Sequence, residues 1–256
     1  QRKADPHFGY VLDCDYKEYT HIKVCYVPNY AGFIYNDALK EKLTLSMCAA
    51  IDYLNGTYVP LGQSILQNAY YPTAKDNYVD IKHALNQLST YDHLAVDIET
   101  YALKFYDAGI GSIAFATSAT DGVAFKVDID KETPNYVLRE LLADFFENFK
   151  GKMIFHNANF DVKVLIYSLF MDNLLDEEGK QIGLSVFNNI DDTKLLSYLA
   201  LNNTSRANLS LKELAHEYVG NYAVDVKDIT KLDTEVLLEY NLLDSCATMY
   251  VYDKYL

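Results

Sequence analysis

Apolar and β-branched runs in the middle of the chain predict the strands of a central sheet. The predicted strands are residues 94–100, 109–119, 122–130 and 152–158. The turn residues Thr120, Asp121 and Gly122 predict a tight hairpin between the second and third of these strands. The chain is therefore predicted to have an α/β fold in which helices alternate with the later strands.

Apolar residues at helical spacing predict the helices that accompany this sheet. They cover residues 136–150, 159–171, 191–203, 209–220 and 233–256. Pro134 is placed to open the first helix and Gly151 to end it, and Ser210 with Glu213 predicts a capping box. The last helix is amphipathic over its whole length. The acidic stretch 171–189, which two glycines interrupt, predicts a loop or a short hairpin.

Residues 1–90 predict a smaller, separate α/β segment, followed by a domain at 91–256. Its predicted strands are residues 21–30 and 65–72, and its predicted helices are residues 35–56 and 79–89. Gly56 is placed to end the longer helix. No cluster of acids, histidines or nucleophiles in this segment indicates chemistry.

The charge balance limits how this chain can bind nucleic acid. Its 256 residues include 36 acidic and 22 basic side chains, which gives a formal net charge of −14. Broad binding of a phosphate backbone depends on Lys and Arg. Any contact with DNA or RNA is therefore expected at a small site where metal ions supply the positive charge.

The four cysteines and the apolar runs indicate the compartment. The cysteines show no CxxC pair and no regular spacing, which argues against a zinc site and a disulfide framework. We therefore expect a reducing cytoplasm. No window approaches 18 consecutive apolar residues, so no membrane span is predicted.

Acidic side chains in three separate segments suggest one metal site. Asp97 and Glu99 are two apart on a predicted strand and share a face, where they repel each other unless a cation lies between them. Asp161 lies in the first turn of a helix just after a strand, and Tyr240 and Asp244 are one helical turn apart. Each pattern alone also fits solvated acids or a polar helix stripe.

Together, the four carboxylates suit a particular chemistry. Carboxylate oxygens are ligands for Mg²⁺ or Mn²⁺, which take the rest of their coordination shell from water and substrate phosphate. Two such ions about 4 Å apart can clamp the attacking and leaving oxygens of a displacement at phosphorus. A tyrosine hydroxyl nearby would orient the attacking water.

Three motifs resemble those of the DEDD superfamily of 3′→5′ exonucleases, in the subclass with a tyrosine in the third motif. They are DIETYAL at 97–103, HNANFD at 156–161 and YNLLD at 240–244. The segments 191–203 and 209–220 are similar to the same region of family A DNA polymerase proofreading domains. The resemblance, from about Asp92 to Leu256, implies a ribonuclease H-like fold with a mixed central sheet flanked by helices.

The resemblance also implies a role for each candidate residue. Asp97, Glu99 and Asp244 would hold the metal ion that carries the nucleophilic water. Asp97 would bridge to a second divalent ion, which Asp161 would bind, in part through water. Tyr240 would position the nucleophile.

Further residues match family positions at the 3′-terminal nucleotide. Thr100 would contact the end of the strand, Leu103 would pack against the last base, and Asn157 would make an amide contact. Leu103 also fits an ordinary core position. Tyr222 is a candidate for stacking on a base, because stacking tolerates any sequence.

The implied reaction is hydrolysis of the last phosphodiester at the 3′ end of single-stranded or frayed DNA, with release of nucleoside 5′-monophosphates. The implied partner is a family A DNA polymerase. This chain would be either a domain of that polymerase or a separate subunit that serves it. The implied location is a bacterial or phage-infected cytoplasm. Residues 27–60 resemble a vestigial uracil-DNA-glycosylase-like region of some bacteriophage polymerases, without identifiable glycosylase residues, so a scaffold is expected there.

Two other functions remain open at this point. A ribonuclease D-like enzyme that trims RNA uses the same four acids and tyrosine. A catalytically silent domain would serve as a structural or partner-binding platform, although such relatives usually lose metal ligands and this sequence retains all four.

Overall fold

The computed structural model describes residues 7–34, 39–63, 65–129, 135–201, 208–221 and 229–256. The chain forms two compact units. The first combines Gln1–Ile65 with Tyr198–Tyr222, and the second combines Leu66–Ser197 with Ala223–Leu256. The predicted domains, 1–90 and 91–256, stay a prediction, although residues 66–90 lie in the second compact unit.

The first unit is built from short elements around one long helix. They are β1 (Val11–Asp13), η2 (Lys17–Tyr19), β2 (Lys23–Cys25), η3 (Tyr30–Ile34), α1 (Leu39–Asn55), α7 (Leu211–Leu214) and α8 (His216–Val219). Strands β1 and β2 pair antiparallel. Helix α1 ends directly before Gly56, whose φ of 74° lies in the left-handed region, as the sequence predicts.

The single capped helix predicted at 209–220 is wrong. Two short helices form instead, because the backbone of Ala215 leaves helical geometry between them. Ser210 makes no side-chain capping bond, and Glu213 forms an ion pair with Lys42 of α1. The acid that the capping box requires is therefore engaged in a tertiary contact.

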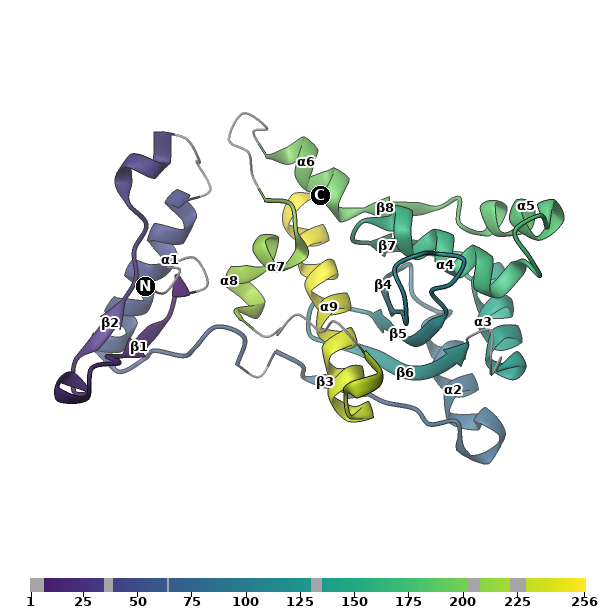
Figure 1. Cartoon of the computed structure of the whole chain (residues 1–256), viewed down its shortest axis with the longest axis horizontal. Helices are drawn as coiled ribbons and strands as arrows, with labels where there is room; N and C mark the ends of the chain where they lie inside the picture. The colour runs from purple at the N-terminus through teal and green to yellow at the C-terminus, as the bar shows by residue number, and fades with distance from the viewer. Residues whose placement is uncertain (1–6, 35–38, 64, 130–134, 202–207, 222–228) are drawn as a thin grey trace. The chain divides into compact units, whose positions relative to one another are not determined.

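The second unit contains a mixed sheet that, among the described residues, has six strands. They are β3 (Asn68–Tyr70), β4 (His93–Glu99), β5 (Ile110–Ala116), β6 (Asp121–Ile129), β7 (Lys152–Phe155) and β8 (Ile190–Asp192). The strand order is β3-β6-β5-β4-β7-β8 (Figure 1). Strands β4, β5 and β6 run antiparallel in turn, whereas β7 is parallel to β4 and β8 is parallel to β7.

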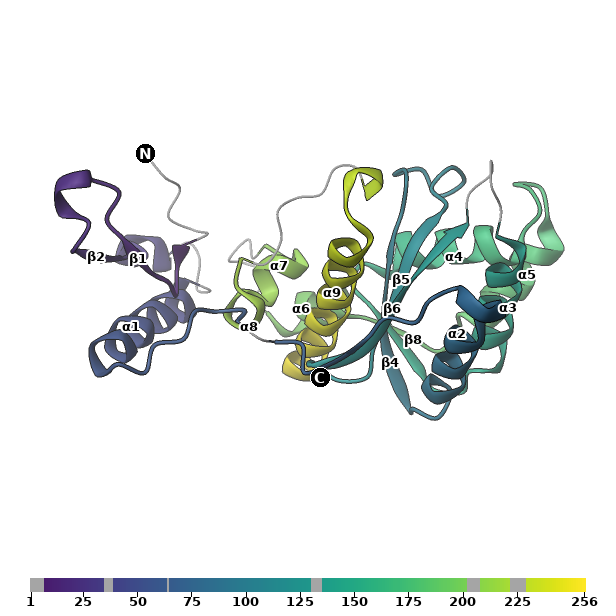
Figure 2. The same cartoon turned by 90° about the horizontal axis from the view of Figure 1, so that it is seen from below.

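Helices cover both faces of this sheet. They are α2 (Lys75–Leu88), α3 (Tyr136–Asn148), α4 (Ala158–Phe170), α5 (Glu177–Val186), α6 (Thr193–Ala200), the short η5 (Ile229–Lys231) and α9 (Thr234–Tyr255). Figure 2 shows α9 on one side of the sheet and α2, α3 and α5 on the other. Within the described ranges, no helix is both long enough and apolar enough to cross a membrane.

The two sheet faces carry side chains of different size. On the face under α2, α3 and α4, large side chains form the main core, among them Ile113, Phe115, Phe125 and Phe155. On the face under α9, the packed residues are mostly alanines, namely Ala95, Ala114, Ala116 and Ala124, together with Ile154. Because side chains alternate along a strand, Asp97 and Glu99 share the face of Ala95. The small side chains allow α9 to lie close to these acids.

The predicted loop or hairpin at 171–189 is wrong, because α5 forms there. The side chain of Asp176 accepts a hydrogen bond from the Gly179 amide and caps the helix. A Cβ at Gly183 would lie 2.6 Å from Cγ2 of Ile166 on α4. The glycines that suggested a loop therefore include one that permits close packing of two helices.

Smaller corrections concern the ends of elements. The β5–β6 turn consists of residues 117–120, and Asp121 and Gly122 already belong to β6. Helix α3 ends at Asn148, before Gly151, because Phe149 has an extended backbone. Asn135 caps the start of α3, while Pro134 lies outside the described residues.

The predicted helix at 191–203 begins at Thr193, since Ile190–Asp192 forms β8. Helix α9 is not amphipathic throughout. Five consecutive residues, Ser245–Met249, are buried on all sides of the helix.

Candidate active site

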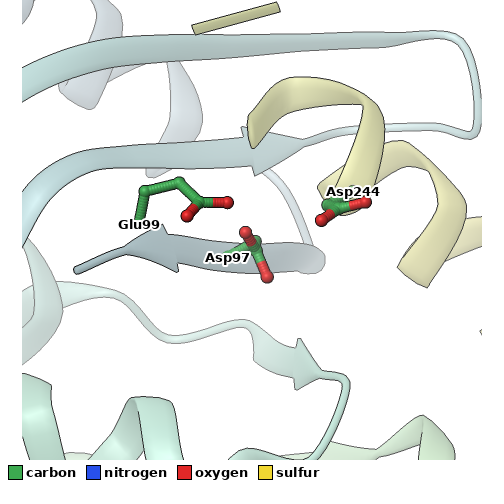
Figure 3. Close-up of side chains that lie close together, drawn as sticks. All are labelled: Asp97, Glu99 and Asp244. Carbon is green, nitrogen blue, oxygen red and sulfur yellow. The ribbon is translucent and has the colours of Figure 1, made fainter. Parts of the chain in front are cut away.

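Three of the four predicted acids meet where α9 crosses the end of β4. Asp97 and Glu99 come from β4 and Asp244 from α9, and Figure 3 shows the three carboxylates together. One carboxylate oxygen from each residue lies within 4.8 Å of the other two. Among the residues that the structure describes, this set has three members, and Asp161 is not one of them.

Asp161 reaches the same region from another direction. Strand β7 runs parallel to β4, so both strands end at the same edge of the sheet, and α4 begins just after β7. Asp161 lies in the first turn of α4, as predicted, and is buried. Its charge acts on Asp97, and the charge of Glu99 acts on Asp161. The fourth acid is therefore close enough to interact with the charges of Asp97 and Glu99.

Burial and mutual repulsion raise the pKa values of two of these acids, Asp97 and Asp161. Burial raises the pKa of Asp97 well above its ordinary value, and the charges of Asp244, Asp161 and Glu99 add to this effect. Burial likewise raises the pKa of Asp161 to about 8, with further contributions from Glu99 and Asp192. Such a cluster is unfavourable when every member is ionised and no cation is bound.

A divalent cation fits this arrangement. The donors are carboxylate oxygens, which are the ligands that Mg²⁺ and Mn²⁺ prefer. A bound cation would remove the repulsion that raises the pKa values. The chemistry of the donor set therefore agrees with a divalent metal site.

Tyr240 lies on α9, one helical turn before Asp244, and is half-buried. Residues four apart on a helix are neighbours on one face. The predicted role of Tyr240 in orienting the attacking water stays a prediction.

The predicted nucleotide contacts lie on the loop after β4 and at the start of α4. The hydroxyl of Thr100 donates a hydrogen bond to the carbonyl of Ala102, at 3.1 Å. Leu103 is 90% exposed, which excludes the alternative that it is a core residue. Asn157 is exposed and accepts a hydrogen bond from Nζ of Lys194 at 3.2 Å. Their contacts with substrate stay predictions, and Tyr222 lies outside the described residues.

Sequence reasoning missed Asp192. Its two carboxylate oxygens accept hydrogen bonds from the backbone amides of Asn157 and Ala158, each at 3.0 Å. Asn157 has a left-handed backbone with a φ of 67° at the start of α4. Asp192 thus fixes the turn that delivers Asp161. It was missed because its segment was predicted to be helical, whereas it ends strand β8.

Sequence reasoning also missed Asn241, which follows Tyr240 on α9. Its Nδ2 donates a hydrogen bond to Oδ2 of Asp97 at 2.7 Å. The residue type gave no signal, because an asparagine within a helix has many possible partners.

Comparisons with known proteins agree with this geometry. Residues 72–255 match the model of a family described as 3′-5′ exonuclease. Among curated protein sequences, none matches this chain.

Solved structures of several nucleases are similar to this chain. Brucella melitensis NrnC with bound Mg²⁺ is 14% identical, with a TM-score of 0.50 over 74% of this chain and 80% of that chain. The catalytic core of RRP6 from Trypanosoma brucei is 17% identical, with a TM-score of 0.50 over 76% of this chain and 47% of that chain. Escherichia coli RNase D, an exoribonuclease, is 16% identical, with a TM-score of 0.47 over 74% and 44% of the two chains.

The predicted fold, a mixed sheet flanked by helices of the ribonuclease H-like type, is confirmed by the strand order and the family match. The prediction that divalent metal ions serve as cofactors is confirmed by the family and by the acid cluster. The match covers more than half of the chain. This chain therefore belongs to the 3′-5′ exonuclease family, in its DEDD type, and is a metal-dependent 3′→5′ exonuclease.

Proposed function

We propose that this exonuclease removes nucleoside 5′-monophosphates from the 3′ end of single-stranded or frayed DNA. The observation that carries the proposal is the set of carboxylate oxygens from β4 and α9 that lie within 4.8 Å of one another. A site of this size, with several acids, can accept a phosphate only when cations are bound.

The acids divide into two groups in this proposal. Asp97, Glu99 and Asp244 would hold one ion, and Asp161 with Asp97 would hold the second. When bound, the two ions would supply charge stabilisation for the attacking and leaving oxygens at phosphorus. The hydroxyl of Tyr240 accepts a hydrogen bond from the attacking water and orients it.

The loop after β4 recognises the terminal nucleotide. The exposed side chain of Leu103 packs against the last base, while Thr100 and Asn157 contact the end of the strand. Because these contacts do not depend on base identity, the enzyme accepts any terminus. A frayed end is preferred, because a paired terminus must first be unpaired.

We also propose that the enzyme serves a family A DNA polymerase, as one of its domains or as a subunit. The similarity of residues 191–203 and 209–220 to polymerase proofreading domains supports this partnership. The net charge of −14 gives little attraction for a phosphate backbone. A polymerase that holds the DNA would overcome this weakness.

The test is a time course on 5′-labelled oligonucleotides of one sequence, as DNA and as RNA, with Mg²⁺, Mn²⁺ or chelator. We expect a ladder that shortens from the 3′ end, faster on DNA and faster on a mispaired terminus than on a matched one. Asp244→Asn, which keeps the side-chain volume, is the control and should be inactive. Faster degradation of RNA would instead favour the RNA-trimming function, and activity in chelator would contradict metal catalysis.

A further inference from the structure

A short chain of hydrogen bonds lies directly behind Asp97. Oγ of Ser112 donates to Oδ1 of Asn241 at 2.9 Å, and Nδ2 of Asn241 donates to Oδ2 of Asp97 at 2.7 Å. Ser112 comes from β5, Asn241 from α9 and Asp97 from β4. The chain therefore connects three elements that meet under the active site.

The backbone places these residues on one face of the sheet. Ser112 is the cross-strand partner of Glu99 in the β4–β5 ladder, so its side chain shares the face that carries the acids. Asn241 lies three residues before Asp244 on α9, so the two side chains are neighbours on the helix surface. The same close approach of α9 that delivers Asp244 also delivers the amide of Asn241.

The amide of Asn241 has only one favourable orientation. Both Ser112 and Asn241 are fully buried, with relative exposures of 0%, so water cannot replace either bond. Turning the amide over would direct its oxygen at a carboxylate oxygen of Asp97 and its nitrogen at the Ser112 hydroxyl. An ionised carboxylate only accepts hydrogen bonds, so Asp97 determines which end of the amide faces it, and the hydroxyl of Ser112 holds the other end.

We propose that Asn241 and Ser112 are positioning residues that preorient Asp97 for the metal ion. This inference depends on the proposed function, since it assigns Asp97 as a metal ligand. With Oδ2 of Asp97 accepting a hydrogen bond from Asn241, the carboxylate is held in place and Oδ1 would be available to the cation. The donated bond also offsets part of the repulsion from Glu99 and Asp244 before a cation arrives.

The test measures the Kd of Mn²⁺ for the whole chain by electron paramagnetic resonance. Asn241→Leu removes the donor but keeps the volume. Loss of an outer hydrogen-bond partner of a metal ligand typically weakens metal affinity about 10- to 100-fold, and we expect a change of that size. At a fixed metal concentration, the variant should have a lower kcat and an unchanged KM for DNA. Its activity should recover partly when the metal concentration is raised.

Ser112 provides a matched pair of variants. Ser112→Thr and Ser112→Val add the same volume to a buried position, but only threonine retains the hydroxyl. We expect Ser112→Thr to bind Mn²⁺ several times more tightly than Ser112→Val. Thr248→Val is the control on α9, because the Thr248 hydroxyl is buried and has no hydrogen-bond partner among the described residues. It should leave the Kd unchanged.

The outcomes separate this inference from the proposed function. If wild type and Thr248→Val bind no Mn²⁺, the proposed function fails. If wild type binds Mn²⁺ and folded Asn241→Leu binds it equally well, the inference is wrong. Should Asn241→Leu show no cooperative melting, the Ser112 pair decides, and equal Kd values for threonine and valine overturn the inference.

Discussion

The two faces of the central sheet are built for different purposes. Under α2, α3 and α4, large side chains fill the space, and the rings of Phe115 and Phe125 stack with centroids 6.3 Å apart. Under α9, alanines replace them, and the same strands present Asp97 and Glu99. One face gains stability from burial of apolar area. On the other face, small side chains let α9 approach the sheet, and Asp244 is thereby placed beside Asp97 and Glu99 despite their repulsion.

The difference shows where function is costly. Carboxylates that are buried near one another destabilise the metal-free protein, as the raised pKa values of Asp97 and Asp161 indicate. The apolar face supplies the stability that allows this arrangement to persist. Removing an acid from one face and a large apolar side chain from the other should therefore have opposite effects on the stability of the metal-free protein.

The largest expected effect is that of Asp97→Asn on the functional face. We expect kcat to fall at least about 1,000-fold, since loss of metal binding removes several kcal/mol of transition-state stabilisation. The same variant should melt at a higher temperature than wild type in chelator, because it removes a buried charge among like charges. Single-turnover kinetics and calorimetry measure both effects. An active Asp97→Asn enzyme would contradict the assignment.

Phe115→Ala tests the apolar face. Phe115 is fully buried and contacts the rings of Phe125, Phe145 and Phe146. We expect a loss of about 3–5 kcal/mol in the free energy of unfolding, from lost burial and from the cavity. Denaturant titration measures it. Where the variant remains folded, its Kd for Mn²⁺ should equal that of wild type, and a large change would show that the faces are not independent.

Ala114→Val tests whether small side chains are needed under α9. Ala114 is fully buried and lies opposite Asp97 in the β4–β5 ladder. Extra methyl groups should cost about 1–3 kcal/mol and move α9 away from β4. Metal affinity should therefore fall together with stability. Val127→Leu, on the apolar face, is the control that should lower stability alone.

The last expected effect concerns pH. Because the folded-state pKa of Asp161 is raised from 3.8 to about 8, the folded protein binds more protons than the unfolded chain between these values. Stability of the metal-free protein is therefore greatest at low pH within this window and falls as pH rises towards 8. Melting temperatures in chelator at pH 5.5, 7 and 8.5 should decrease in that order. Mg²⁺ or Asp161→Asn should reduce the decrease, and a rise with pH would contradict it.

Local sequence pattern predicted much of the fold. The strands of the sheet from β4 to β7 and the helices α3, α4 and α9 follow from apolar periodicity, and Gly56 ends α1 as expected. Helix α5 could not be predicted, because Gly183 is needed for close packing against Ile166 of α4, and the sequence does not show that contact. The predicted capping box was also overridden by a distant partner, since Glu213 forms an ion pair with Lys42.

The residues of the candidate site also fall into two groups, those that local spacing identified and those that only the fold reveals. The acids were identified because their spacing within each motif is local, on one strand face or one helix turn. The partners of those acids come from distant segments, as with Ser112 and Asn241, which are 129 residues apart in sequence. Such partners become visible only when the topology is known.

Anomalous diffraction from crystals grown with Mn²⁺ is the most direct test of the central claim that these acids form a metal site. We expect two peaks about 4 Å apart. One peak should contact Asp97, Glu99 and Asp244, and the other should contact Asp97 and the region of Asp161. Ordered crystals with no peak at these carboxylates, or with peaks only elsewhere on the surface, would contradict it.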